Sequence, residues 1–372
     1  MKLCIVTHKV AKGDGQGRVN YEVTQEALRR GHQVTVVATH IAESLQKQSG
    51  FNWVPISVGK VPTELLKNLR FASLSSQWLN AHGREFDLVK VNGAITWASA
   101  DVNAAHFVHS AWLDSPAHVW QQHKDAYGLY QWLYTALNAR WEGRAFAQAR
   151  QIIAVSAQVR DDLQKIGVAS DRIQVIYNGV DTNEFYPGHC DRKALALPEV
   201  VPLAIFAGDI RSSRKNLDSV LKALVKVSGL HLAVVGNVTG SPYPALAREL
   251  AVDGRVHFLG YRQDIPDLMR TSDFLVFPSR YETFGLVVLE AMASGIPVIT
   301  SAATPAAELL DPEAGIVISN PDDIPTLVKE MLYLTHHPIQ RKQMGIHARV
   351  IAENHSWSQM AQHYIDRFEQ LA

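Results

Sequence analysis

The sequence predicts an α/β protein made of two doubly wound domains, each with a parallel β-sheet covered by helices. Short apolar runs alternate with helix-period segments along the whole chain, which is typical of parallel sheets buried on both faces. The chain has 372 residues, more than one hydrophobic core usually organises. The alternation stops at a turn-rich segment, 178–188, and then starts again, which indicates a domain boundary.

The first domain begins with a strand at Leu3–Val6, followed by a helix that carries Val19 and Val23 on its apolar face. Later strands are expected at Gln33–Ala38, Asp87–Val91, Ala104–Val108 and Gln151–Val155. Between the first strand and helix, the glycine-rich loop Gly13–Arg18 brings backbone amides close to any bound anion. It fits a dinucleotide fingerprint poorly, because Asn20 stands where the third glycine belongs. A flexible connection is an equal alternative.

The second domain repeats the pattern. A strand at Leu203–Ala207 precedes a helical stripe that includes Leu217, Val220 and Leu221. Further strands are expected at Leu232–Val235, Val256–Leu259, Phe274–Phe277 and Pro297–Thr300. Periodicity predicts a closing helix from about Trp357 to Leu371.

Composition narrows the function classes. The 36 basic and 36 acidic residues give no net charge, so no nucleic-acid partner is expected. The only cysteines, Cys4 and Cys190, lie far apart, which agrees with a reducing compartment. The N-terminus shows no signal-peptide pattern, and no apolar run reaches transmembrane length. We therefore expect a cytoplasmic location, with the inner face of the membrane as a second location.

Two segments are candidates for peripheral or acceptor contacts. Val61–Phe71 combines leucines with basic residues, as interfacial helices do. A stretch from Trp112 to Trp141 is crowded with Trp and Tyr, whose faces suit sugar stacking or a lipid carrier. For the aromatic stretch, packing of long first-domain helices is the alternative.

Three cations, Arg211, Arg214 and Lys215, lie between a predicted strand end and the next predicted helix. Together with helix-terminal amides they would stabilise a diphosphate. In the alternative interpretation, Asn216 caps the helix and the cations are solvated.

The segment Glu282–Glu290 is the most informative in the chain. A helix is predicted from Gly285 to Ser294, so that Glu282 precedes the helix and Glu290 lies on it. Its free N-terminal amides then lie between two carboxylates. Carboxylates accept hydrogen bonds from hydroxyl groups, and helix-terminal amides bind anions. The segment therefore predicts a site for a sugar, a ribose and a diphosphate.

His109 stands at the end of a predicted strand, where it can hydrogen-bond a sugar hydroxyl or a developing charge. His106 is a weaker neighbour, and Asn92 ends the strand before. The chain has 16 histidines, so a structural role remains the alternative for each of them.

Several blocks in order carry a resemblance to a known family: Gly31–Val34, Ile153–Ser156, Asn178–Asp181, Lys215–Leu217 and Asp273–Val298. With these blocks the chain resembles glycosyltransferase family 4, the retaining enzymes of the GT-B fold. The resemblance implies two Rossmann-like domains that face each other across a cleft, with the C-terminal helix crossing back to the first domain. We expect an acceptor-side domain at 1–183, joined by about 355–372, and a donor domain at 184–354.

The resemblance also implies residue roles. Glu282, His109 and Lys215 would be catalytic: Glu282 would contact the transferred sugar, His109 would lie near the reacting carbon, and Lys215 would neutralise the departing diphosphate. The other implied donor-binding residues are Gly15, Gly17, Arg262, Phe284, Gly285, Leu286 and Glu290, the last on the ribose. Where the family often has an arginine this chain has Asp209, so Arg211 or Arg214 would replace that charge. The loop Ser301–Glu308 also departs from the family pattern, although Glu308 matches.

The implied activity is retaining transfer of a hexose from a nucleotide diphosphate sugar, with UDP-glucose or a related UDP-hexose as the leading donor. A saccharide or lipid-linked saccharide is the expected acceptor, in polysaccharide or glycolipid biosynthesis. No Asp-x-Asp motif is present, so we expect no metal and no cofactor. A non-catalytic nucleotide-sugar binding subunit and a sugar phosphorylase are alternatives. A nicotinamide-dependent dehydrogenase is disfavoured by the incomplete glycine fingerprint.

Overall fold

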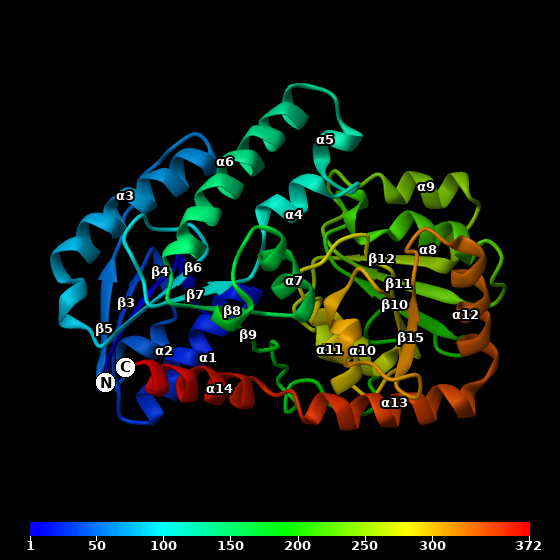
Figure 1. Ribbon diagram of the computed structural model, residues 1–372. Helices are drawn as coiled ribbons and strands as arrows, with labels where there is room; N and C mark the ends of the chain where they lie inside the picture. The colour runs from blue at the N-terminus through cyan, green and yellow to red at the C-terminus, as the bar shows by residue number, and fades with distance from the viewer. The chain divides into compact units, whose positions relative to one another are not determined.

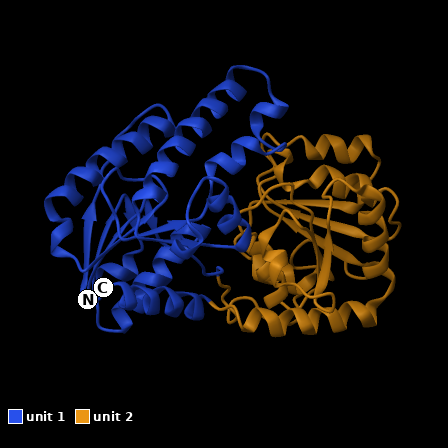
Figure 2. Cartoon of the chain, viewed as in Figure 1, with its two compact units in different colours: residues 1–178, 357–372 blue, residues 179–356 orange.

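The computed structural model describes all 372 residues and separates the chain into two units, shown in Figures 1 and 2. Unit 1 comprises residues 1–178 and 357–372, and unit 2 comprises residues 179–356. The boundary at 178/179 lies five residues before the expected position 183/184, and the chain returns to unit 1 at 357 rather than about 355.

Unit 1 contains a seven-stranded parallel sheet in the order β5-β3-β1-β6-β7-β8-β9. Its strands are β1 (Lys2–Val6), β3 (Gln33–Ala38), β5 (Phe51–Pro55), β6 (Leu88–Asn92), β7 (Val102–Ala105), β8 (Gln151–Ala154) and β9 (Ile173–Val175). Two short strands, β2 (Lys9–Val10) and β4 (His40–Ile41), pair separately. Because β1 pairs with both β3 and β6, the strand order reverses beside β1. Ligands bind at such switch points in open α/β sheets.

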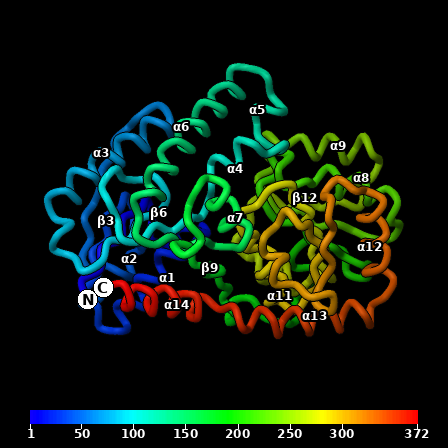
Figure 3. The backbone as a smooth tube through the Cα atoms, in the orientation of Figure 1, coloured from blue at the N-terminus to red at the C-terminus, as the bar shows by residue number.

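The helices of unit 1 are α1 (Gly15–Arg29), α2 (Glu43–Gln46), α3 (Glu64–His82), α4 (His109–Asp114), α5 (Val119–Gln122), α6 (Ala126–Gln148), α7 (Ala157–Lys165) and α14 (Trp357–Leu371). Helix α1 turns Val19, Val23 and Ala27, all fully buried, toward the core. It lies beside α14, as the tube in Figure 3 shows near the two chain ends. The predicted closing helix is therefore confirmed, and it belongs to unit 1.

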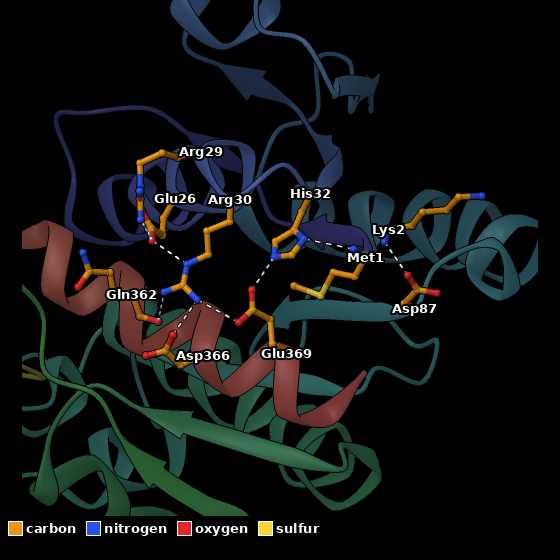
Figure 4. A network of polar contacts seen from close by, with 10 residues as sticks. All are labelled: Met1, Lys2, Glu26, Arg29, Arg30, His32, Asp87, Gln362, Asp366 and Glu369. Atoms are coloured by element: carbon orange, nitrogen blue, oxygen red, sulfur yellow. Dashed lines mark hydrogen bonds and ion pairs between the residues drawn. The ribbon is translucent and has the colours of Figure 1, made fainter.

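Polar contacts hold α14 to the start of the chain (Figure 4). Arg30, at the end of α1, contacts Asp366 at 2.7 Å and Glu369 at 3.0 Å. His32 Nε2 lies 2.9 Å from Glu369 and its Nδ1 lies 3.2 Å from the N-terminal amine of Met1. Tyr364 and Phe368, also on α14, are buried and supply the apolar part of the attachment.

Unit 2 contains a six-stranded parallel sheet in the order β12-β11-β10-β13-β14-β15. Its strands are β10 (Leu203–Ala207), β11 (His231–Val235), β12 (Val256–Gly260), β13 (Phe274–Phe277), β14 (Val298–Ser301) and β15 (Gly315–Ile318). Its helices are α8 (Leu217–Leu224), α9 (Tyr243–Glu249), α10 (Ile265–Thr271), α11 (Leu286–Ala293), α12 (Ile324–His336) and α13 (Pro338–Glu353). The strand order reverses between β10 and β13. The fold class predicted from the sequence is confirmed.

Short 3₁₀ turns complete the chain: η1 (Gly83–Glu85), η2 (Ser170–Arg172), η3 (Ser213–Lys215), η4 (Asp253–Arg255) and η5 (Pro305–Leu309). Two of them, η3 and η5, lie next to loops that follow strands of the second sheet.

Two sequence expectations in unit 1 need correction. The strand expected at Ala104–Val108 is β7, which ends at Ala105, where its partner β8 also ends. The expected loop Gly13–Arg18 is mostly helical, because Asp14 caps α1 by accepting a hydrogen bond from Gly17 N at 2.6 Å. The glycine at 17 is required by packing, since an added Cβ would lie 2.8 Å from the Ala11 carbonyl oxygen.

The candidate interfacial segment Val61–Phe71 also has a definite structure. Helix α3 starts within it at Glu64, and Thr63 caps the helix. Leu66 is 46% exposed, whereas Phe71 is fully buried. No helix of the chain has the length and apolar character needed to cross a bilayer.

Candidate active site

The switch point of unit 2 brings two predicted site segments together. The loop after β10 leads through Gly208 to η3, which ends at Lys215, and the loop after β13 leads to Glu282. Since β10 and β13 are neighbours, both loops leave the same edge of the sheet. This edge is where open α/β sheets bind their ligands.

Lys215 and Glu282 form an ion pair at this edge, and their side chains are 12% and 9% exposed. The Lys215 ammonium also lies 5.2 Å from the centre of the Phe277 ring, a favourable cation–π distance. Burial, together with the positive charge of Arg214, lowers the pKa of Lys215 well below its usual value. The Glu282 carboxylate acts in the opposite direction, because a negative charge favours the charged form of a neighbouring lysine. Both side chains have little access to water.

Arg280 fixes the two loops against each other. Its backbone N–H donates to the Arg214 carbonyl at 2.8 Å, and its guanidinium donates to the Ser213 carbonyl at 2.6 Å. The same guanidinium binds both carboxylate oxygens of Asp218, at 2.9 and 2.8 Å. Such two-point contacts are geometrically specific. The clamp therefore sets the position of Lys215 relative to the loop that carries Glu282.

Helix α11 starts at Leu286, four residues after Glu282 and one residue after the predicted start. Gly285 occupies its N-cap in the left-handed region, with φ of 95° and no side-chain cap. The N–H groups of Leu286 and Val287 lie at the start of this first turn, where N–H groups have no partner within the helix, whereas Val288 N already donates to Gly285 O at 3.0 Å. Glu290 lies partly exposed one turn further along the helix. Glu282 thus precedes the amides and Glu290 follows them, as the sequence predicted.

The loop that follows β14 supports the same turn. Ala303 O accepts a hydrogen bond from Glu282 N at 3.2 Å, and Phe284 O accepts one from Ala306 N at 2.7 Å. Ser301 Oγ donates to Ser279 O at 2.5 Å. The part of Ser301–Glu308 that departs from the family pattern thus has a structural function, which is to brace the segment from Ser279 to Phe284.

The remaining predicted cations differ from one another. Arg211 is mostly exposed and forms an ion pair with Asp209 at 2.9 Å. Burial acts to raise the pKa of Asp209, but its hydrogen bonds with Arg211 outweigh this effect and lower the pKa. Arg214 is more enclosed, and burial lowers its pKa. Arg262 forms a two-point pair with Asp264. Asp209 therefore neutralises the charge of Arg211, one of the two residues expected to take the place of the family arginine.

In unit 1, His109 is the first residue of α4 rather than the end of a strand. Its Nδ1 lies 2.6 Å from Glu142 Oε1, and its backbone N–H donates to Glu142 Oε2 at 2.8 Å. Glu142 is buried on α6, so it fixes both the ring and the backbone of His109. A histidine held in this way presents its second ring nitrogen to a ligand.

Gly15 and Gly17 also lie in unit 1, in the first turn of α1. The predicted residues thus fall into two groups: His109, Gly15 and Gly17 in unit 1, and Arg211, Arg214, Lys215, Arg262, Glu282, Phe284, Gly285, Leu286 and Glu290 in unit 2.

The sequence did not point to Glu142 and Arg280, which position predicted residues, or to Lys90, which is buried on β6 in the middle of the sheet of unit 1. Lys90 carried a signal, because it interrupts the apolar strand Leu88–Val91. Glu142 lies 33 residues from His109, in a helix whose sequence gives no such signal. No group of three or more His, Cys, Asp or Glu side chains is placed to hold a metal ion.

Comparison with known families gives matches over both units. Residues 13–184 match the model described as "Glycosyltransferase Family 4", and residues 190–350 match "Glycosyl transferases group 1". A D-inositol 3-phosphate glycosyltransferase of Mycobacterium tuberculosis is 36% identical over 163 residues. That match spans 41% of this chain and 34% of the relative's length.

Two solved structures share the fold. One is WaaG, a glycosyltransferase involved in lipopolysaccharide biosynthesis, with a TM-score of 0.79, 23% identity and coverage of 98% of this chain and 99% of that one. The other is HepE of Anabaena in complex with UDP-glucose, with a TM-score of 0.75, 20% identity and coverage of 100% of this chain and 100% of that one.

Proposed function

The chain belongs to glycosyltransferase family 4, and from this premise we propose that it transfers a hexose from a nucleotide diphosphate sugar to a saccharide or lipid-linked saccharide. UDP-glucose or a related UDP-hexose is the leading donor. The observation that carries the proposal is the Lys215–Glu282 pair beside the free amides of α11. HepE, which shares the fold, was solved with UDP-glucose, and this supports the choice of donor.

Donor binding would replace the contact between Lys215 and Glu282 by a contact of each residue with the donor. The diphosphate binds the Lys215 ammonium and the first amides of α11. An anion at a helix N-terminus is stabilised by the helix dipole and by the free N–H groups. Glu282 is then released from Lys215 and accepts hydrogen bonds from the sugar hydroxyls. Glu290 accepts those of the ribose. A nearby anion also raises the pKa of the lysine, so Lys215 stays protonated when the leaving group needs its charge.

The proposed reaction is metal-independent and retains the anomeric configuration. An acceptor hydroxyl oxygen forms a bond to the anomeric carbon as the bond from that carbon to the diphosphate oxygen breaks. The hydroxyl proton passes to the departing diphosphate. Lys215 and the α11 amides stabilise the charge that develops on the leaving group, a role that fixed positive groups perform well. The roles of His109, Gly15 and Gly17 toward the donor rest on the family resemblance.

A thermal-shift screen against UDP, GDP, ADP and NAD tests the proposal, because a ligand that binds only the folded state raises the melting temperature. UDP is expected to give the largest rise in the wild-type protein and a much smaller rise in Lys215→Met. If only NAD raised the melting temperature, or if none of the four nucleotides did, the proposal would be contradicted.

Product analysis then tests the chemistry. Incubation with UDP-glucose and an acceptor should yield an α-linked product by NMR, at a rate unchanged by EDTA. A β-linked product would refute retention, and loss of activity that added divalent ions restore would refute metal independence. Binding of UDP-glucose without any turnover would identify a non-catalytic subunit. Sugar phosphate formed from a disaccharide would identify a phosphorylase.

A further inference from the structure

Lys90 is a buried cation on β6 to which the proposed reaction gives no role. Its side chain is fully buried, and its strand neighbours Leu88, Val89 and Val91 are buried and apolar. Strand β6 pairs with β1, beside the point where the strand order of the first sheet reverses. A buried charge costs free energy unless it is paired or hydrogen-bonded. The contacts of its ammonium group therefore indicate what Lys90 holds in place.

The ammonium group of Lys90 donates hydrogen bonds to two asparagine side chains. One acceptor is Asn92 Oδ1 on the same strand, at 2.9 Å, and the other is Asn20 Oδ1 on α1. Asn20 is fully buried, like Val19 and Val23 on the same helix. An ammonium group donates hydrogen bonds and accepts none. The oxygen of the Asn20 amide therefore faces β6, and its NH₂ group is directed away from Lys90.

The NH₂ group of Asn20 binds the first turn of α1 and the residue after β1. Its Nδ2 donates to Gln16 O at 3.0 Å and to Thr7 Oγ1 at 3.1 Å. Gln16 O belongs to the peptide group that joins Gln16 to Gly17. The N–H of this peptide group donates to Asp14 Oδ1 at 2.6 Å. The peptide group is therefore held at both ends, by Asn20 at its oxygen and by the helix cap at its N–H.

Loss of the Lys90 ammonium group would break this chain of contacts. With an apolar side chain at position 90, Asn20 Oδ1 would be buried without this partner, which costs free energy. If the Asn20 amide turned over instead, its oxygen would face Gln16 O, and neither oxygen can donate a hydrogen bond. In both arrangements the first turn of α1 loses a contact that fixes its position.

The family resemblance assigns this turn, through Gly15 and Gly17, to the donor. The N–H groups of Gly15 and Gln16 lie at the start of α1, where N–H groups have no partner within the helix. Such groups bind a phosphate when they point at it. We propose that Lys90 is a positioning residue for the donor: through Asn20 it fixes the first turn of α1, whose N–H groups receive the diphosphate. The inference rests on the proposed function, because that function supplies the diphosphate.

NMR titration of the full chain with UDP and with uridine tests this role, because uridine lacks the diphosphate. Lys90→Met keeps most of the side-chain length and removes its N–H donors. We expect the Kd for UDP to rise about ten-fold in this variant, as loss of a hydrogen bond from a charged group does, whereas the Kd for uridine should not change. Wild-type affinity for UDP in folded Lys90→Met, or an equal loss of affinity for both ligands, would overturn the inference.

A double-mutant cycle tests whether Lys90 acts through Asn20. Asn20→Leu breaks the same link without a change in β6, so it also tests the inference if Lys90→Met does not fold. It should weaken UDP binding about ten-fold as well. The double variant should lose no more affinity than either single variant, because the two residues belong to one chain of contacts. Losses of affinity that add would show that Lys90 does not act through Asn20.

Leu79→Ala is the control for a general loss of stability, because Leu79 is buried near the end of α3. Its affinity for UDP should equal that of the wild type, and urea unfolding confirms that every variant is folded. A wild-type chain that binds no UDP would refute the proposed function and this inference with it. A wild-type chain that binds UDP, with equal affinity in Lys90→Met and Asn20→Leu, would refute the inference alone.

Discussion

Lys90 places an ammonium group in the middle of a parallel sheet, with a side chain that is completely buried. Its hydrogen bonds to Asn20 and Asn92 replace part of the water it loses, but burial still lowers the pKa of Lys90 to about 7. At the residue scale, this is the clearest case of a group kept in spite of its cost. A buried charge retained in this way is often linked to function.

Lys90→Met is therefore expected to change how stability depends on pH. The unfolded chain keeps Lys90 protonated up to about pH 10, whereas the folded chain releases the proton near pH 7. Between these values the unfolded state binds more protons, so this group makes stability rise with pH. Urea midpoints at pH 7 and pH 9 should differ more in the wild type than in Lys90→Met. The same pH dependence in both proteins would be incompatible with a depressed lysine pKa.

Lys47→Met is the matched control, because Lys47 is exposed in the same unit. Its urea midpoints should follow those of the wild type at both pH values.

The sequence identified single residues better than it identified their partners. Lys215 and Glu282 were both predicted at the site, but their mutual ion pair was not, because they lie in loops after different strands. The role of Asp209 was likewise hidden. It appeared only as a departure from the family, and the structure shows that it pairs with Arg211. Such contacts depend on side-chain geometry that residue types alone do not determine.

At the scale of elements, the start of α11 is the most constrained part of the site. Gly285 has a φ of 95°, and an added Cβ would lie 2.5 Å from Thr304 Cγ2. Positive φ is costly for residues with a Cβ. The same turn is braced from η5, which follows β14, by the hydrogen bond that Ala306 N donates to Phe284 O. The first-turn amides of α11 are therefore positioned by backbone contacts on both sides.

Gly285→Ala is expected to destabilise the protein by roughly 1–3 kcal/mol, the usual cost of a strained backbone conformation. It should also weaken UDP binding, because the α11 amides shift with the turn. Differential scanning calorimetry and a UDP titration measure the two effects. Gly254→Ala is the control, since a Cβ there has open space. Wild-type stability and UDP affinity in Gly285→Ala would disprove the constraint.

Element prediction succeeded where strands are buried and apolar. Strands β3, β10 and β13 have the predicted bounds. Five strands were missed: β2, β4, β5, β9 and β15. Two of them carry weak signals, because β5 at the sheet edge reads Phe-Asn-Trp-Val-Pro and has no buried residue, and β9 has only three residues. The glycine-rich start of α1 was missed because glycine is a poor helix former, yet the Asp14 cap and close packing at Gly17 favour a helix there.

At the scale of the whole molecule, the chain passes from unit 1 to unit 2 and returns. Helix α13 belongs to unit 2 and α14 to unit 1. The last helix of the chain, α14, has fifteen residues and completes the first unit rather than the second. Its attachment combines the buried Tyr364 and Phe368 with the contacts of Arg30 and His32 in Figure 4. Fold class and connectivity were both predictable, because they follow from periodicity and the family resemblance.

Phe368→Ala should therefore destabilise unit 1, although position 368 is close to the C-terminus. Loss of a buried phenylalanine costs about 3–5 kcal/mol. Hydrogen exchange followed by mass spectrometry should show faster exchange in α1 and β1, with unit 2 unchanged. Gln370→Ala, exposed on the same helix, serves as the control. Unchanged exchange in α1 would show that α14 does not support unit 1.

The central claim is that Lys215 and Glu282 form the centre of a nucleotide-sugar transferase. The most direct test is the rate of UDP release from UDP-glucose, in the presence of an accepted sugar, for the wild type, Lys215→Met and Lys226→Met. Lys226 is exposed in the same unit. We expect Lys215→Met to lower kcat roughly 100-fold, as loss of a preorganised positive group does, and Lys226→Met to match the wild type. UDP release at the wild-type rate from folded Lys215→Met would contradict the claim.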